Sequence, residues 1–106
     1  MWNIDIDTLA AAPSDAVIID VRESMEFVRG HVPGAVPLPM SQLASRLGEL
    51  DRSRRTFVIC ATGNRSGAMT DLLRARGFDA WNVAGGTAAW VRSGRPLDAG
   101  MPSRAA

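Results

Sequence analysis

Residues 56–66 read TFVICATGNRS, and this stretch decides the class of fold. Its first five residues form a nearly continuous apolar run, which is typical of a strand covered on both faces of a parallel sheet. A short loop containing Gly63 follows, and a helical pattern begins at Arg65. The stretch therefore predicts a buried strand, a tight loop and a helix, with Cys60 at the carboxyl end of the strand.

Similar runs recur on both sides of this stretch. They predict four further short strands, at residues 2–4, 16–20, 36–38 and 80–83. Apolar residues at helical spacing predict five helices between the strands, at residues 7–11, 23–29, 41–50, 65–76 and 87–92. Asp7 and Ser41 are the expected N-caps of the first and third helices, and Gly77 is expected to end the fourth. This alternation predicts an α/β fold with a mostly parallel central sheet of about five short strands, flanked by helices on both faces.

Length and composition fit one globular domain. The chain has 106 residues, of which 46% are hydrophobic and 22% charged. The domain is expected over residues 1–96. Residues 97–106 are expected to form a flexible C-terminal tail, because proline, glycine and alanine dominate the end of the chain.

Charge and cysteine content exclude several classes of function. The net charge is +1, which argues against binding to nucleic acid or to an anionic membrane through bulk charge. The chain start shows no signal peptide and no long apolar run, so a cytoplasmic location is expected. The single cysteine excludes an internal disulfide and, with only one histidine, argues against a zinc site within one chain.

The position of Cys60 makes it the main candidate for chemistry. Ligand sites in α/β sheets lie at the carboxyl ends of the strands, where loop amides and a helix N-terminus can surround an anion. Such surroundings lower the pKa of a thiol from its free value of about 8.5, and Arg65 adds a fixed cation at the rim. Cys60 is therefore the predicted nucleophile, although a small buried hydrophobic role is the alternative. The predicted substrate-binding residues are those that follow it: Ala61, Thr62, Gly63, Asn64 and Arg65.

Two blocks of this sequence resemble the rhodanese domain family, which has a sulfurtransferase fold. The first is DVRESMEFVRGHVPGA at residues 20–35, similar to the family pattern of Asp-Val-Arg, three residues, Glu, an aromatic, and then Gly-His and Gly-Ala. The second is the loop itself, a cysteine with glycine three residues on and arginine five residues on. A weaker similarity lies around Gly77, Gly85–Gly86 and Trp90. The resemblance covers residues 4–96.

The resemblance implies a sulfurtransferase that works through a persulfide on Cys60. The thiolate would take the outer sulfur of a donor such as thiosulfate, sulfite would leave, and an acceptor such as cyanide or a thiol would then remove the sulfur. The loop amides would stabilise the anionic persulfide. No cofactor and no metal are implied. The implied partners are the small donor and acceptor, with a sulfur-accepting protein as a further candidate, and neither nucleic acid nor a membrane.

Three alternatives to a single-domain sulfurtransferase remain. A persulfide relay module that works with a partner protein is favoured by the neutral residues Ala61 and Thr62, because Arg or Lys sometimes occupies these positions in the family. A cysteine-dependent phosphatase or arsenate reductase is disfavoured, because cysteine phosphatases place five residues between Cys and Arg, whereas four, residues 61–64, lie here. A purely structural or regulatory domain is disfavoured by the presence of both Cys60 and Arg65.

Other polar residues of the first block are expected to be structural. Arg22 and Glu26 are spaced i, i+4, which predicts an ion pair on one helical face, with a substrate contact for Arg22 as the alternative. Asp20 is expected to cap the next helix or to hold loop amides. His31 precedes a turn, so we expect a structural role rather than a Cys-His pair. Special backbone angles are expected at four glycines: Gly34, Gly63, Gly85 and Gly86.

Overall fold

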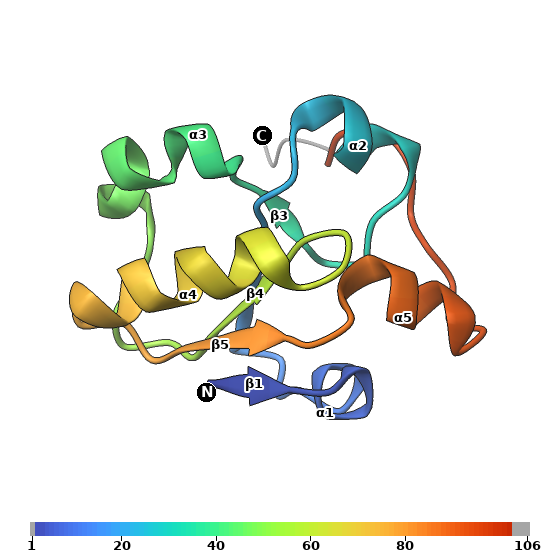
Figure 1. Cartoon of the computed structure of the whole chain (residues 1–106), viewed down its shortest axis with the longest axis horizontal. Coiled ribbons are helices and arrows are strands. Elements are labelled where there is room, and N and C mark those ends of the chain that lie inside the picture. The colour runs from blue at the N-terminus through green and yellow to red at the C-terminus, as the bar shows by residue number, and fades with distance from the viewer. Residues whose placement is uncertain (1, 103–106) are drawn as a thin grey trace.

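Five parallel strands form the central sheet of the computed structural model, which describes residues 2–102 (Figure 1). The strands are β1 (Asn3–Ile4), β2 (Val17–Asp20), β3 (Val36–Pro37), β4 (Thr56–Ile59) and β5 (Ala80–Val83). Their order in the sheet is β1-β5-β4-β2-β3, so β4 is central and pairs with β2 and β5. The predicted α/β fold with a five-stranded parallel sheet is confirmed.

Helices cover both faces of this sheet. They are α1 (Ile6–Ala10), α2 (Ser24–Arg29), α3 (Met40–Leu43), the 3-10 helix η1 (Ala44–Glu49), α4 (Asn64–Ala75) and α5 (Gly86–Arg92). One hydrophobic cluster lies on each face of the sheet. On one face, Val58 packs with Leu43 of α3 and Leu73 of α4. On the other, Ile59 packs with Phe27 of α2 and Trp90 of α5. Alternate residues of β4 therefore point to opposite layers, and all four of its residues are buried.

Two helix starts differ from those predicted, at α1 and at α3, where the helix begins at Met40 and Ser41 lies inside it instead of capping it. Asp5, not Asp7, caps α1, because the Asp5 carboxylate accepts a hydrogen bond from the Thr8 backbone N–H at 2.8 Å. The helix expected over residues 41–50 is divided into α3 and the 3-10 helix η1, and inside η1 the backbone at Arg46 leaves helical geometry at φ −116°. The Arg46 guanidinium donates to the Glu49 carboxylate at 2.8 Å in an exposed ion pair.

The end of the chain runs back along α2. The backbones of Asp98 and His31 form an antiparallel bridge with two hydrogen bonds of 2.9 Å, and the N–H of Gly100 donates to the carbonyl of Val28. Asp98 and Gly100 of the expected tail are thus hydrogen-bonded to the domain, while residues 103–106 lie outside the described residues. The domain boundary at residue 96 stays a prediction. Among residues 2–102, no helix is long and apolar enough to cross a membrane.

Candidate active site

The loop between β4 and α4 wraps around the sulfur of Cys60. Cys60 directly follows the central strand, and its residue is only 1% exposed. Gly63 then adopts a left-handed backbone with φ 107°, which reverses the chain into α4. This conformation suits glycine because glycine has no Cβ.

Three hydrogen-bond donors converge on the Cys60 sulfur. The backbone N–H of Gly63 donates to Sγ at 3.2 Å, the backbone N–H of Ser66 at 3.4 Å and the Ser66 hydroxyl at 3.2 Å. Burial by itself would raise the pKa of the thiol, but the hydrogen bonds from Ser66, Gly63 and Thr62 outweigh burial and lower the pKa below its usual value. The loop and the start of α4 therefore favour a thiolate, as a helix N-terminus does for an anion.

This geometry predicts how the reactivity of Cys60 depends on pH. Because the folded protein lowers the pKa of the thiol, the thiolate fraction rises at a lower pH than in a free thiol of pKa about 8.5. The rate of alkylation by iodoacetamide should therefore reach half of its plateau below pH of about 8.5. A midpoint at or above that value, with Cys60 accessible to the reagent, would contradict a thiolate-stabilising loop. The same protein unfolded in denaturant is the control and should show the free-thiol midpoint.

The other predicted binding residues surround the sulfur in different ways. The carbonyl of Ala61 accepts a hydrogen bond from Ala88 at 3.0 Å, so this residue fixes the loop against α5. Thr62 and Asn64 are exposed. The side chain of Arg65 does not lie free at the rim: both of its terminal nitrogens bind the Glu26 carboxylate, at 2.8 and 2.9 Å.

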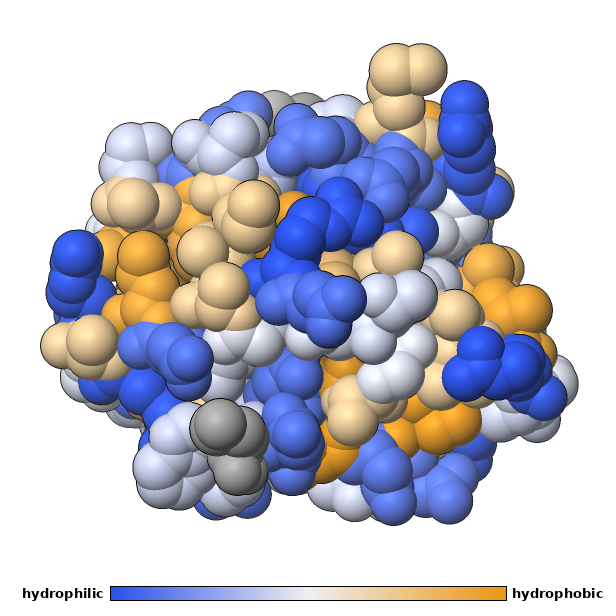
Figure 2. Space-filling model, viewed as in Figure 1, coloured by the Kyte–Doolittle hydropathy of each residue, from blue (hydrophilic) through white to orange (hydrophobic). Residues whose placement is uncertain are grey.

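The ion pairs near the loop differ from the predicted one. Glu26 pairs with Arg65, and the hydrogen bonds from Arg65 hold the pKa of the Glu26 carboxyl at about 2. Arg22 pairs instead with the buried Asp20 at 2.8 Å and also donates to the Gly30 carbonyl at 2.8 Å. The predicted Arg22–Glu26 pair is wrong because α2 starts at Ser24, so the two residues do not share a helical face. Figure 2 shows hydrophilic side chains gathered between α2 and the start of α4, where Glu26 and Arg65 meet.

His31 belongs to the packing of α2. Its ring stacks on Phe27 with a centroid distance of 3.7 Å, and its Nδ1 lies 2.9 Å from the Phe27 carbonyl oxygen. A carbonyl oxygen can only accept, so Nδ1 carries the proton of this hydrogen bond. The expected structural role agrees with these contacts.

The start of α5 holds the loop from the other side. The N–H of Thr87 donates to the Cys60 carbonyl at 2.9 Å, and the Thr87 hydroxyl donates to the same oxygen at 3.2 Å. Gly86 lies so close that a Cβ built on it would be 2.4 Å from the Cys60 carbonyl oxygen. The expected special backbone angles are confirmed at Gly85 and Gly86, with φ of 80° and 59°.

Two residues that touch or support the sulfur were not identified from the sequence. Ser66 lies in the first turn of α4, and its hydroxyl also donates toward the Asn82 carboxamide oxygen at 2.6 Å. Asn82 is a buried polar residue inside β5. A signal was available for each: a hydroxyl in the first turn after the loop, and an amide inside an apolar strand, where a buried polar side chain needs a partner.

Comparison with known proteins relates this geometry to one family. The family model of the rhodanese-like domain matches residues 5–93. An Allochromatium vinosum protein named "Sulfurtransferase" is 32% identical over 90% of this chain and 92% of its own length. In Bacillus subtilis, "Putative sulfurtransferase YtwF" is 34% identical over 80% of this chain and 82% of its own. "Putative sulfur carrier protein YrkF" is 34% identical over 70% of this chain and 40% of its own.

Solved structures give the same relation. The crystal structure of a rhodanese-related protein from Thermoplasma volcanium has a TM-score of 0.87 at 31% identity and covers 92% of this chain and 98% of that one. A rhodanese-like domain protein from Staphylococcus aureus has a TM-score of 0.85 at 32% identity and covers 95% of this chain and 100% of that one. The arrangement of strands and helices is therefore shared over nearly the whole chain.

Proposed function

The chain belongs to the rhodanese-like domain family, and on that premise we propose that it transfers a sulfane sulfur from a donor such as thiosulfate to a nucleophilic acceptor through a persulfide on Cys60. The names of its relatives support the coarser role of sulfur transfer or sulfur carriage. The observation that carries the finer proposal is the Cys60 sulfur itself, buried at the end of the central strand and facing three hydrogen-bond donors.

The proposed reaction consists of two displacements on sulfur. In the first, the Cys60 thiolate attacks the outer sulfur of thiosulfate, a new S–S bond forms, and the old S–S bond breaks with its electron pair leaving on sulfite. The total charge of about −3 is conserved, since a thiolate and a thiosulfate dianion become a persulfide anion and a sulfite dianion. In the second, cyanide or a thiolate attacks the terminal sulfur and releases the Cys60 thiolate. Covalent catalysis of this kind gives ping-pong kinetics.

The residues of the loop have separate proposed tasks. The backbone amides from Ala61 to Arg65 stabilise the anionic persulfide, as amides do in an oxyanion hole. Ser66 holds the first sulfur through its hydroxyl, and Arg65 supplies a fixed positive charge near the entrance. The Glu26 carboxylate orients Arg65 and partly neutralises its charge, because the two side chains form a bidentate ion pair.

The proposal predicts a covalent change that intact mass spectrometry can detect. After incubation with thiosulfate and removal of the excess, the protein should gain about 32 Da, one sulfur atom, and lose it again with cyanide. Cys60→Ala is the matched control and should gain nothing. A wild-type protein that stays at its original mass over a range of thiosulfate concentrations would contradict thiosulfate as a donor.

A relay module that receives sulfur from a partner protein is the second candidate. Its supporting observation is the weak positive charge of the loop: Ala61 and Thr62 are neutral, and the Arg65 charge is paired with Glu26. Such a loop attracts a dianion such as thiosulfate weakly. The relay is preferred if a persulfidated thiol loads Cys60 readily while thiosulfate loads it slowly, and the enzyme is preferred if thiosulfate loads it within seconds.

The loop length separates sulfur transfer from phosphate chemistry. A phosphoryl group brings three peripheral oxygens, each of which needs a donor at about 2.7–3.1 Å, and the four residues 61–64 leave a small ring around the sulfur. We therefore expect no detectable hydrolysis of p-nitrophenyl phosphate. Insertion of one glycine between Gly63 and Asn64 should abolish sulfur transfer, because it displaces the Gly63 and Ser66 donors. If the protein turned over the phosphate ester faster than thiosulfate, and this turnover required Cys60, a phosphatase would replace the sulfurtransferase as the proposed function.

A further inference from the structure

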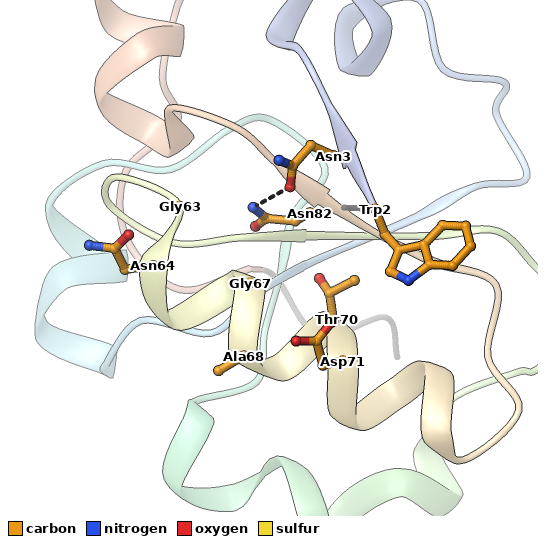
Figure 3. A pocket seen from close by; sticks show the side chains of 9 residues that line it. All are labelled: Trp2, Asn3, Gly63, Asn64, Gly67, Ala68, Thr70, Asp71 and Asn82. Atoms are coloured by element: carbon orange, nitrogen blue, oxygen red, sulfur yellow. Dashed lines mark hydrogen bonds between the residues drawn. The ribbon is translucent and has the colours of Figure 1, made fainter.

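A chain of side-chain hydrogen bonds links the Cys60 sulfur to the edge of the sheet. The Ser66 hydroxyl lies 3.2 Å from Sγ of Cys60 and 2.6 Å from Oδ1 of Asn82. Nδ2 of Asn82 in turn donates to Oδ1 of Asn3 at 3.0 Å, as Figure 3 shows. The four residues come from the loop, α4, β5 and β1, so the chain crosses from the central strand to the edge strand.

The Ser66 hydroxyl cannot satisfy both of its neighbours. A hydroxyl carries one proton, and Ser66 is 0% exposed, so water does not supply a second donor. When the proton points to Asn82, the Ser66 oxygen can accept only from the thiol S–H of Cys60. When Cys60 is a thiolate, the proton must turn to the sulfur, and Oδ1 of Asn82 loses its donor in a site that is 7% exposed.

The Asn82 carboxamide faces Asn3 with its nitrogen and Ser66 with its oxygen. Nδ2 of Asn82 donates to Oδ1 of Asn3, and Oδ1 of Asn82 accepts from the Ser66 hydroxyl. The backbone pairing of β1 with β5 places these two side chains opposite each other. The Asn3 end of the chain opens on a cavity of about 300 Å³ that Gly63, Gly67 and Trp2 also line.

We propose that Asn82 is a positioning residue that acts through Ser66 and opposes the ionisation of Cys60. Its carboxamide oxygen competes with the sulfur for the single Ser66 proton, so formation of the thiolate breaks the Ser66–Asn82 hydrogen bond. The functional importance of this inference rests on the proposed function, in which the Cys60 thiolate starts sulfur transfer. The Ser66 hydroxyl is therefore shared between the sulfur and Asn82, whereas the loop amides donate to the sulfur alone.

The charged groups around Cys60 are already paired and would not change in a test of Asn82. Arg65 of α4 is bound to Glu26 of α2, and Arg22 is bound to Asp20 at the end of β2. The residues that contact Cys60 from α5 and Ser66 from β5, Thr87 and Asn82, are neutral. A neutral substitution of Asn82 therefore leaves every charge near the sulfur in place.

The test is the pKa of the reduced Cys60 in the Asn82→Leu variant, read from the ultraviolet absorbance of the thiolate. Leucine has a similar size but no acceptor, so the Ser66 proton is free for the sulfur, and the pKa should fall by about half to one unit. Ala68→Ser is the matched control, because Ala68 lines the same cavity but lies outside the chain of hydrogen bonds. The pKa of Cys60 in this variant should equal that in the wild type. An unchanged or raised pKa in folded Asn82→Leu would overturn the proposal.

A double-mutant cycle tests whether Asn82 acts through Ser66. Ser66→Ala removes the contested proton, so the addition of Asn82→Leu should shift the pKa no further. A shift of the same size in both backgrounds would show that Asn82 acts by another route and would overturn the proposal. If Asn82→Leu does not fold, Asn3→Ala on the exposed edge strand is the replacement test. This substitution removes the acceptor of the Asn82 NH2, so the Asn82 carboxamide can turn that NH2 toward Ser66, and the pKa of Cys60 should fall by a smaller amount. An unchanged pKa in Asn3→Ala would then overturn the proposal.

The measurement is independent of sulfur transfer. It uses reduced protein without a donor, so a wild-type protein that forms no persulfide would overturn the proposed function and leave the pKa comparison intact. Conversely, a protein that forms the persulfide normally but shows no pKa shift in Asn82→Leu would overturn only the role of Asn82.

Discussion

Replacement of Cys60 by serine is expected to reduce sulfur transfer by a factor of at least about 10³, with the fold unchanged. The oxygen of serine can accept the same hydrogen bonds from Gly63 and Ser66 that the sulfur accepts. An alcohol is barely ionised near neutral pH, however, and it cannot form a persulfide. The measurement is the rate of thiocyanate formation from thiosulfate and cyanide, together with the midpoint of thermal unfolding.

Two controls make this result interpretable. Cys60→Ala should be equally inactive, since it also lacks the thiol. Far-ultraviolet circular dichroism of both variants should match that of the wild type, because the side chain is small and the loop is also held through backbone contacts with α5. More than a trace of cyanide-dependent turnover in a folded Cys60→Ser protein would remove Cys60 from the proposed mechanism.

Gly86→Ala is expected to have the largest effect on stability and to abolish sulfur transfer as well. A Cβ at this position would lie 2.4 Å from the Cys60 carbonyl oxygen and 2.7 Å from the Ala61 carbonyl carbon, both of them backbone atoms that cannot rotate away. The left-handed backbone of Gly86, with φ of 59°, adds the usual strain for a side chain. Together the two effects should lower the free energy of unfolding by about 2–5 kcal/mol.

The chain offers a matched control for this prediction. Gly94 also has a left-handed backbone, with φ of 83°, but nothing lies within 4 Å of a Cβ built there. Gly94→Ala should therefore cost only the backbone strain, about 1–2 kcal/mol, and leave the sulfur-transfer rate of the folded protein unchanged. Denaturant titrations and the thiosulfate assay distinguish the two variants. Equal losses of stability and activity in both would mean that contact between α5 and the loop does not position Cys60.

Most of the fold could be predicted because local patterns encode it. The apolar run ending at Cys60 predicted the central strand, and Gly77, where φ is 88°, was expected at the end of α4. The errors lie where two local signals compete. Asp5 and Asp7 are both adequate caps, and only the contact of Asp5 with Thr8 selects between them. The spacing of Arg22 and Glu26 had meaning only if both lay in one helix.

The candidate site was predicted in part, for a similar reason. The sequence placed Cys60 and Gly63 in one loop and Arg65 at the start of the helix that follows, because these are local features, and it predicted a lowered pKa for the thiol. It did not find Ser66 as a donor to the sulfur or Asn82 as its second partner. Their roles depend on where β5 lies relative to α4, which no local spacing contains.

The sequence by itself determined the alternation of strands and helices, the place of Cys60 at a strand end and the length of its loop, since hydrophobic periodicity, caps and turn residues act over a few neighbouring positions. Only the tertiary structure decided which side chains meet. Glu26 and Arg65 are 39 residues apart, and Asn3 and Asn82 are 79 apart. Their pairing follows from the strand order β1-β5-β4-β2-β3, which is set by how the whole chain buries its two apolar layers rather than by any short stretch.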